Sequence, residues 1–519
     1  MSAARIGEAA ALALCRQLPA GLDPLELYAA LSDRGRRRDT LLLERSVGPG
    51  LLLDKAALRV ECRGPQVEVA ALSDGGVNVA AALAGHLPER VVERTTDRLI
   101  LTFPPIDSPD LEERLRAPSP FSVLRFLSGG LKIMSAEEPF TLATLGIVAF
   151  DHVDLIETLP PSAEDPLGFP DFVFWLAESL IVFEPGARPR AICTAFGSAD
   201  AKADERAYFG ATQRLADLVA RCGRAEKLTF PPRQDRAPDF SDTDLDDDAY
   251  ADVVARMKGH IAEGEVYQIV PSRTFRAPCA DPLRSYTALR ALDPSPYHFF
   301  VAAPDHVVFG ASPETSVRVF GEKGTGHKVE VKPIAGTRPR GTTGDEDDRL
   351  EAEMRLDAKE AAEHMMLVDL ARNDVARVSG AGTRRVEKLL TVERYARVMH
   401  LVSSVTGALR PGTDALDALQ ACLNVGTLTG APKIRATQLL RETEITKRGP
   451  YGGAIGWLNG EGMMDTAVVI RTAVVRDGAA FVRAGAGIVH DSDPQREADE
   501  TRRKASALLT VLAQTGAAT

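Results

Sequence analysis

The chain has 519 residues, of which 45% are hydrophobic and 26% charged, a composition typical of globular proteins. Its 73 acidic and 62 basic residues give a net charge of −11, which disfavours nucleic acids and anionic membrane surfaces as partners. No run approaches the ~20 apolar residues of a membrane span, and the start lacks a secretory signal, so we expect a cytoplasmic location. Six scattered cysteines without CxxC spacing favour reduced core thiols over disulfides or zinc ligands.

The first part of the chain mixes short apolar runs with helical patterns. Residues 1–18 predict a helix with one apolar face. Strands or buried segments are expected at Leu41–Leu43, Leu51–Leu53, Val91–Val92, Leu99–Phe103 and Phe172–Phe183. Residues 231–248, PPRQDRAPDFSDTDLDDD, are rich in proline and aspartate and predict a linker. We therefore divide the chain into residues 1–230, the linker 231–248 and residues 249–515.

The second region alternates helical periods with strands that end at glycines. Helices are expected over Tyr250–Ile261, about Asp345–Arg372, Leu416–Leu423, Lys433–Leu440, and from Pro494 to the end. Strands are expected over Val266–Phe275, Val307–Phe309, Thr315–Phe320, Val329–Val331, Gly452–Leu458, Thr466–Val475 and Ala480–Ala484. Because short turns join these strands, we predict an α+β fold with mainly antiparallel sheet.

Two glutamate pairs occur at helical spacing in this region. Glu360 and Glu363 lie in the long helix, and Glu497 and Glu500 lie in the last helix. Residues three apart share one face of a helix, so two such faces together would present four hard oxygen ligands suited to Mg²⁺. Lys504 follows on the same face as Glu497 and could hold a carboxylate beside the metal. Taken alone, each pair is more often a solvated helix face.

Three loops rich in glycine and small residues accompany the glutamates, and each alone is more often a tight turn. They are Pro333–Gly341, Gly426–Lys433 and Ala484–Gly487. The second ends in Pro432 at a predicted helix start, where backbone amides could receive an anion. An anionic substrate in an acidic chain needs such local positive charge.

Seven motifs give these residues a known context. In order they are EAAEHMMLVDLARND (360–374), VMHLVSSVTG (398–407), GTLTGAPK (426–433), YGGAIGW (451–457), VVIRTAVV (468–475), AGAGIV (484–489) and EADETRRKA (497–505). The chain resembles the chorismate-utilising enzymes, and within them anthranilate synthase component I. The resemblance is strong from about Asp247 to Leu512 and continues upstream in FSVLRFL (121–127) and FVFWLAESLIV (172–182). It implies a large two-layered fold. The N-terminal region would carry the regulatory site, contact a partner subunit and contribute strands to the sheet of the core.

The resemblance also implies roles for matching residues. Glu360, Glu363, Glu497 and Glu500 would hold Mg²⁺, which binds the ring carboxylate of chorismate. The substrate would be bound by Gly336, Thr337, Thr427, Tyr451, Arg471, Gly485, Gly487 and Lys504. The catalytic residues would be His400, Glu314 and Thr427. His400 would transfer a proton or orient the ring, although a lone histidine can also be a hydrogen-bonded core residue. Glu314 would protonate the departing 4-hydroxyl, provided that burial raises its pKa.

Two substitutions choose the nucleophile within the family. Gln268 stands where the water-using isochorismate and salicylate synthases place a lysine base, and an amide cannot take a proton from water. Ala335 stands where aminodeoxychorismate synthases carry a nucleophilic lysine. Both favour ammonia and the synthesis of anthranilate and pyruvate. A 2-amino-2-deoxyisochorismate synthase that stops after amination remains an alternative, as does, from another class, a non-catalytic scaffold or sensor.

The partners are implied by the resemblance. No glutaminase signature occurs in the chain, so ammonia would come from solution or from a separate glutamine amidotransferase subunit, component II, in a hetero-oligomer such as a heterotetramer. The family's tryptophan site for feedback inhibition would match Glu44, Ser46, Pro296, Tyr297 and His298. Two departures from the family pattern, Arg45 and His298, bear on its affinity.

Overall fold

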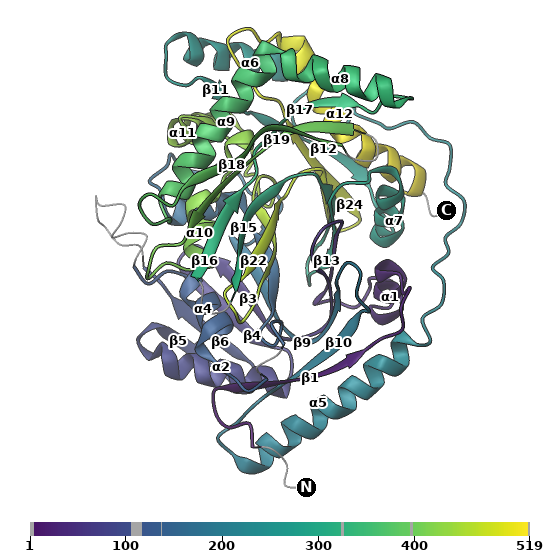
Figure 1. Cartoon of the computed structure of the whole chain (residues 1–519), viewed down its shortest axis with the longest axis vertical. Coiled ribbons are helices and arrows are strands. Elements are labelled where there is room, and N and C mark those ends of the chain that lie inside the picture. The colour runs from purple at the N-terminus through teal and green to yellow at the C-terminus, as the bar shows by residue number, and fades with distance from the viewer. Residues whose placement is uncertain (1–4, 105–116, 136–137, 323–325, 395–397, 517–519) are drawn as a thin grey trace.

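The computed structural model describes residues 5–104, 117–135, 138–322, 326–394 and 398–516, without the side chains of Glu322, Thr337 and Lys359. Runs of consecutive strands are interspersed with helices along the described residues. Figure 1 shows α1, α2 and α5 at the end near the N-terminus, with α6, α8, α9 and α12 at the opposite end. No helix in the described ranges is long and apolar enough to cross a membrane.

The strands before the linker are β1 (Ala10–Gln17), β2 (Thr40–Arg45), β3 (Gly50–Arg63), β4 (Gln66–Ala71), β5 (Val91–Arg94), β6 (Arg98–Thr102), β7 (Lys132–Ile133), β8 (Thr144–Val148), β9 (Phe172–Phe183) and β10 (Arg190–Phe196). The helices there are α1 (Pro24–Leu31), α2 (Asp74–His86), α4 (Phe121–Arg125) and α5 (Ala201–Cys222), with short helical turns η1 (Pro88–Arg90), η2 (Phe126–Gly130) and η3 (Phe150–Leu155).

The strands after the linker are β11 (Gln268–Ile269), β12 (Ser272–Pro278), β13 (Tyr297–Ala302), β14 (Val307–Ser312), β15 (Thr315–Glu322), β16 (Gly326–Val331), β17 (Ile334–Pro339), β18 (Arg385–Arg394), β19 (Val398–Ala408), β20 (Gly430–Ala431), β21 (Ala454–Leu458), β22 (Met464–Val468), β23 (Thr472–Arg476) and β24 (Ala479–Gly485). The helices are α6 (Asp247–Ala262), α7 (Pro282–Leu292), α8 (Gly344–Leu356), α9 (Ala358–Ala376), α10 (Ala415–Cys422), α11 (Lys433–Thr443) and α12 (Pro494–Thr515), with the turn η4 (Gly426–Leu428).

Successive pairings join 22 of the described strands into one sheet system, and β11 with β20 forms a separate two-stranded sheet. Among the named strands β1 and β7 pair in parallel, and the other ladders, such as β13 with β14 and β8 with β9, are antiparallel. The predicted α+β fold with mainly antiparallel sheet is therefore confirmed. Strands from both sides of the linker pair with one another, β2 with β13 and β8 with β21.

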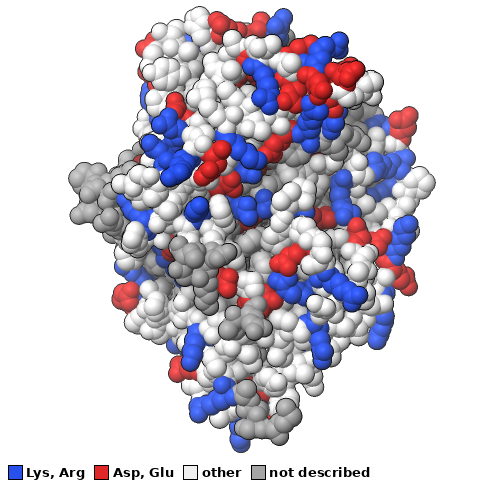
Figure 2. Space-filling view, viewed as in Figure 1, with Lys and Arg blue, Asp and Glu red and all other residues white. Residues whose placement is uncertain are grey.

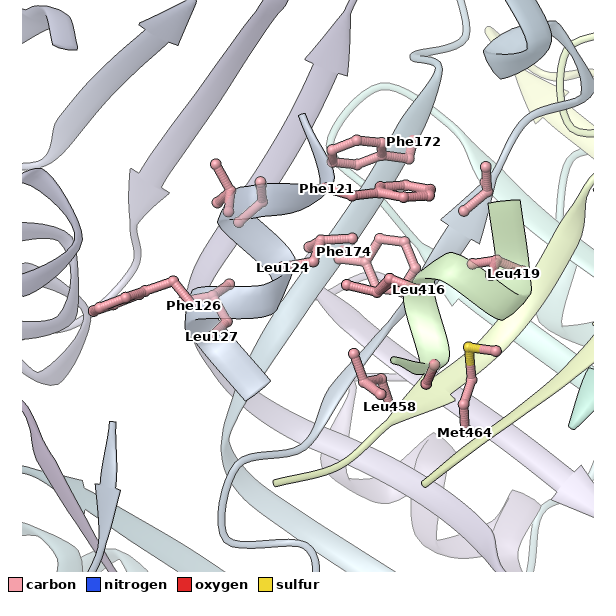
Figure 3. Packing of buried hydrophobic residues seen from close by; sticks show 14 of the residues in the cluster. Phe121, Leu124, Phe126, Leu127, Phe172, Phe174, Leu416, Leu419, Leu458 and Met464 are labelled. Atoms are coloured by element: carbon pink, nitrogen blue, oxygen red, sulfur yellow. The ribbon is translucent and has the colours of Figure 1, made fainter. Parts of the chain in front are cut away.

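The core also crosses the linker. One large buried cluster combines Phe121 and Leu124 of α4, Phe172 of β9, and Leu416 and Leu419 of α10. Figure 3 shows the α4 side chains pointing toward those of α10 across the β9 aromatics. Arg125, on the same helix, pairs with Asp414 and Asp417 at the start of α10. The segment FSVLRFL is thus part of the support of the C-terminal half.

Charged residues concentrate on one exposed helix. On the face drawn in Figure 2, acidic and basic side chains crowd the upper edge, where Figure 1 places α8. Arg355 pairs with Glu351 within α8, and Arg394 of β18 reaches Asp348 and Glu351. Such exposed pairs add little stability individually.

Four sequence expectations about elements are corrected. Residues 1–18 were expected to be helical, but Ala10–Gln17 form strand β1 because its apolar residues pair with β10. The expected helix from Asp345 to Arg372 is broken at Asp357, whose side chain accepts the Glu360 N–H at 3.1 Å and caps α9. The run 466–475 forms two strands, and the run 266–275 forms β11 and β12.

Candidate active site

Glu314 lies in the turn between β14 and β15, with its carboxyl group buried. Its Oε1 accepts a hydrogen bond from the Thr427 hydroxyl at 2.9 Å, so η4 and the β14–β15 turn meet at this carboxyl. Burial raises the pKa of Glu314 to about 7, although the Thr427 hydrogen bond and the charges of Lys504 and Arg471 act in the opposite direction. Glu314 can therefore carry a proton near neutral pH.

Lys504, Gly485 and Tyr451 form a second group. The Lys504 ammonium, on α12, donates to the Gly485 carbonyl at 2.9 Å and pairs with Glu500 at 2.8 Å. A Cβ on Gly485 would lie 2.6 Å from the Pro271 carbonyl and 3.1 Å from the Tyr451 hydroxyl, so glycine permits this close approach of backbone. Burial raises the pKa of Tyr451 to about 12, which keeps its hydroxyl protonated.

Gln268 lies at the first position of β11, opposite Ala431 of β20. Its Nε2 lies 2.8 Å from the position that a Cβ on Gly487 would take, which places the amide directly against the AGAGIV loop. Its Oε1 is buried and has no hydrogen-bond partner in the structure. A buried carbonyl oxygen without a donor is costly unless a ligand or water supplies one.

Gly336, His400 and Glu360 form a third group at the irregular pairing of β17 with β19. Gly336 lies in the register shift with φ +65°, and its carbonyl accepts a hydrogen bond from His400 Nδ1 at 3.2 Å. Burial lowers the pKa of His400, so the ring is neutral near pH 7, with Nε2 as its acceptor. A Cβ on Gly336 would lie 3.0 Å from Glu360 Oε2. The backbone of Thr337 pairs with His400, and its side chain lies outside the described residues.

Arg471 lies between β22 and β23 and reaches both catalytic candidates electrostatically. Its charge lowers the pKa of Glu314 and the pKa of His400. Its guanidinium Nη1 donates to Asp293 Oδ2 at 3.2 Å. Arg471 and Lys504 together supply the positive charge that an anionic substrate needs.

The four predicted metal ligands are half-buried, two on α9 and two on α12. Glu360 pairs with Arg338 at 3.0 Å, and Glu500 pairs with Lys504. Across the described part of the chain, three ligand atoms within 4.8 Å of one another occur at His260, Glu263 and Glu265, and not among the four glutamates. The joint metal site therefore stays a prediction.

A buried arginine supports the loops of the site. Arg448 donates to the Leu428 carbonyl at 2.6 Å and to the Val270 carbonyl at 2.7 Å, and it pairs with Glu444 at 2.7 Å. Arg483 pairs with the same glutamate. Because Leu428 belongs to η4 and Val270 follows β11, these bonds fix the Thr427 turn relative to Gln268.

The five predicted inhibitor residues lie along one strand pair. In the antiparallel pairing of β2 with β13, Glu44 is opposite His298, and the Ser46 N–H donates to the Pro296 carbonyl at 3.0 Å. Glu44 accepts a hydrogen bond from Tyr286 at 2.6 Å and pairs with Arg290 at 2.7 Å. A pocket beside them is lined in part by Glu44, Arg45, Tyr297, His298 and Trp457.

Three residues that the motifs did not indicate take part in these sites. Arg338 pairs with Glu360, Asp293 holds Arg471, and Arg45 pairs with buried Asp465 and stacks on the Tyr297 ring at 4.3 Å. Arg338 had a signal, because it lies in the glycine- and proline-rich loop 333–341. Arg45 was indicated as a departure from the family's inhibitor-site pattern, but its pairing with Asp465 was not. Asp293 had no signal, since its partner Arg471 is distant in sequence.

Known proteins similar to this chain show the family to which it belongs. The model of the chorismate binding enzyme family matches residues 110–510. Anthranilate synthase component 1 of Vibrio cholerae is 44% identical over 516 residues, which cover 96% of this chain and 95% of that relative. Anthranilate synthase component 1, pyocyanine specific, of Pseudomonas aeruginosa is 46% identical over 88% of this chain and 86% of its own length.

A solved structure extends the similarity to the fold. The crystal structure of anthranilate synthase component I from Streptococcus pneumoniae superposes with a TM-score of 0.69 and 30% identity, covering 90% of this chain and 93% of that one. The family model and these relatives extend over most of the chain. The chain therefore belongs to the chorismate binding enzyme family, within its anthranilate synthase component 1 group.

Proposed function

We propose that this chain adds ammonia to C2 of chorismate with loss of the 4-hydroxyl, and then eliminates pyruvate to give anthranilate for tryptophan biosynthesis. The observation that carries the proposal is the buried Glu314 carboxyl, with its pKa raised to about 7, beside Thr427 and within the field of Arg471 and Lys504. A protonated acid can give its proton to the 4-hydroxyl, which leaves as water. The two cations offset the charge of a dicarboxylate substrate.

His400 is the proposed base of the second step. Its Nδ1 donates to the Gly336 carbonyl, so the neutral ring presents Nε2 as the proton acceptor. Removal of the C2 proton and cleavage of the bond between C3 and the enolpyruvyl oxygen release pyruvate and complete the aromatic ring. In this proposal Glu314 is the acid of the first step and His400 is the base of the second.

Gln268 supports ammonia as the nucleophile. The unpartnered Gln268 Oε1 can accept a hydrogen bond from ammonia, whereas an amide cannot deprotonate water. Ala335, in β17, offers no amine for covalent attack. Ammonia needs no base because it is already nucleophilic.

Mg²⁺ is the proposed cofactor, held by Glu360, Glu363, Glu497 and Glu500, in part through water. The residues fit it, because all four are half-buried hard oxygen ligands and the missing Cβ of Gly336 leaves space at Glu360 Oε2. Mg²⁺ commonly keeps several waters, so four directly touching carboxylates are not required. When bound, the metal offsets the negative charge of the ring carboxylate.

One assay tests the activity. The purified chain is incubated with chorismate, Mg²⁺ and excess ammonium at alkaline pH, and anthranilate fluorescence and pyruvate are followed together. We expect equal amounts of both products. A chorismate-derived amine without pyruvate would instead identify a 2-amino-2-deoxyisochorismate synthase. No turnover of chorismate would favour the alternative that the chain is a non-catalytic scaffold or sensor.

The metal has its own test. We expect EDTA to abolish turnover and Mg²⁺ to restore it, and we expect Mg²⁺ to raise the melting temperature in the presence of chorismate. Turnover that is indifferent to EDTA, or a melting temperature unchanged by Mg²⁺, would contradict the metal assignment.

A separate glutamine amidotransferase subunit is the proposed source of ammonia in a cytoplasmic hetero-oligomer. The relatives' designation as component 1 supports a second component, and all six cysteines are unpaired, as in a reducing compartment. Glutamine alone should support no activity until that subunit is added. Size-exclusion chromatography with light scattering then measures the assembly.

Tryptophan is the proposed inhibitor, bound weakly at Glu44, Ser46, Pro296, Tyr297 and His298. Arg45 supports the low affinity, because its guanidinium already occupies the face of the Tyr297 ring and pairs with Asp465. We therefore expect tryptophan to inhibit anthranilate formation only at high concentration. Activity that stays unchanged at the highest tryptophan concentration would contradict the site.

A further inference from the structure

Arg471 has an unusual backbone and depends on its neighbours for its position. Its φ of +48° lies in the left-handed region, which a non-glycine residue adopts only where the surroundings hold it. The Ala311 N–H donates to its carbonyl at 3.2 Å, and its guanidinium donates to Asp293 Oδ2 at 3.2 Å. The arginine side chain is 37% exposed and the aspartate 14%, so the aspartate is the better anchored partner.

Asp293 is itself held from three directions. Its N–H donates to the Leu289 carbonyl at 2.8 Å at the end of α7, and its Oδ1 accepts the Ser295 hydroxyl at 2.7 Å. Its own carbonyl accepts a hydrogen bond from His298 Nε2 at 2.6 Å. Two of these bonds hold the backbone of Asp293 and one holds its carboxylate, so the aspartate can orient a flexible arginine at small entropic cost.

His298 supplies one of these restraints from β13. In the pairing of β2 with β13 it lies opposite Glu44, and its Nε2 reaches back to the Asp293 carbonyl. Two hydrogen bonds therefore link His298 to Arg471 through Asp293. Loss of the His298 ring would release the Asp293 carbonyl.

We infer that Asp293, held by Ser295 and His298, is a positioning residue that aims Arg471 at the substrate carboxylate. The inference rests on the proposed role of Arg471 in binding chorismate. It assigns Asp293 no contact with the reacting atoms.

The direction of the effect follows from charge. A carboxylate near a dianionic substrate repels it, so Asp293 helps binding only if the orientation of Arg471 outweighs that repulsion. We take orientation to dominate because Asp293 is restrained and Arg471 is strained. Loss of Asp293 should then weaken substrate binding, whereas simple repulsion predicts tighter binding.

The first experiment compares Asp293→Ala, Asp293→Asn and, as a matched control, Asp305→Ala in the exposed β13–β14 turn. We expect Asp293→Ala to raise KM for chorismate about tenfold with kcat within about twofold, the pattern of lost binding that is common to ground and transition states. Asp293→Asn keeps an acceptor and should recover part of the loss. An unchanged or lower KM, or a fall in kcat and melting temperature with KM unchanged, would overturn the positioning role.

The second experiment tests, by a double-mutant cycle, whether His298 acts through Asp293. We expect His298→Ala to raise KM about threefold, and Asp293→Ala with His298→Ala to match Asp293→Ala alone, because both act through one chain of contacts. Effects that multiply would show that His298 does not restrain Asp293 for this purpose and would overturn this part of the inference.

A third measurement separates this inference from the proposed function. Chorismate binding is measured by calorimetry without ammonia, so it does not need turnover. Weaker binding in Asp293→Ala supports the inference even if the wild type makes no anthranilate. Equal binding in wild type and Asp293→Ala overturns it even if the wild type is an anthranilate synthase.

Discussion

At the scale of single residues, burial controls the protonation of Glu314 and thereby the proposed chemistry. We predict that Glu314→Gln lowers kcat by roughly 10²–10⁴-fold, because an amide cannot protonate the leaving hydroxyl. Steady-state kinetics of anthranilate formation measure the loss, with Glu442→Gln on the exposed face of α11 as the control. A variant that keeps more than half of the activity would remove Glu314 from the mechanism.

The same substitution has an opposite effect on stability. Burial raises the folded pKa of Glu314 from 4.5 to about 7, so its favourable contribution is fully present below pH 4.5 and is lost as pH rises through 7. Glutamine has no such loss. We therefore expect the melting temperature of Glu314→Gln, relative to wild type, to increase from pH 5 to pH 8. A constant difference across this range would contradict the raised pKa.

A second residue-scale prediction concerns the ion pair between Arg45 and Asp465. Burial raises the pKa of Asp465, and Arg45 opposes this shift. Arg45→Ser would leave a buried carboxylate with an incomplete set of partners, which costs about 3–5 kcal/mol. Adding Asp465→Asn removes the charge and should restore most of the stability in urea denaturation. If the two substitutions lower the free energy of unfolding additively, the pairing is contradicted. Because the double variant frees the face of the Tyr297 ring, tryptophan should inhibit it at lower concentration than it inhibits wild type.

At the scale of elements, glycines decide how closely the site loops approach the strands. A Cβ on Gly485 would lie 2.6 Å from the Pro271 carbonyl, an atom of backbone that cannot move alone. We predict that Gly485→Ala displaces the end of β24, lowers the melting temperature and weakens chorismate binding through Lys504. The matched control is Gly259→Ala in α6, where a Cβ meets nothing within 4 Å and should stabilise by roughly 0.5–1 kcal/mol. Equal behaviour of the two variants would contradict this account.

Hydrophobic periodicity predicted the helices and strands well where the local sequence alone decides between helix and strand. The apolar run Phe172–Phe183 is a strand buried on both faces, and the last helix begins at Pro494 as expected. The helix predicted for residues 1–18 is wrong because an alanine-rich apolar run fits a helix or a strand, and only the pairing of Ala10–Gln17 with β10 decides between them. The break between α8 and α9 at Asp357 could be predicted from the sequence, since an aspartate three residues before a glutamate is a helix-start signal.

The residues of the candidate site could be predicted only where they lie in a motif shared with the family. Glu314, Thr427 and His400 came from the family resemblance, and Lys504 also from its spacing to Glu497. In the structure Thr427 bonds to Glu314, and the charge of Arg471 lowers the pKa of both Glu314 and His400. Asp293 could not be found from the sequence, because its link to Arg471 joins residues 178 positions apart. Contacts of this kind depend on the three-dimensional path of the chain and have no local signature.

At the scale of the whole molecule, the two halves of the chain build one structure. Residues 1–230 supply β8, which pairs with β21, and α4, which packs on α10 in the cluster of Figure 3. Without them, β21 would lose a neighbouring strand and α10 would expose Leu416 and Leu419. Apolar faces of this size are not stable in water without a partner.

We therefore predict that residues 249–519, expressed alone, do not fold cooperatively, although they contain all the predicted metal and catalytic residues. Circular dichroism and urea denaturation should show a broad transition and a small m-value, because little surface is buried cooperatively. Adding a separately expressed fragment of residues 1–248 should restore a sharp transition, since the β8–β21 ladder and the α4–α10 contact can form between chains. A sharp transition of residues 249–519 alone would contradict the prediction, because the linker would then separate two independent domains.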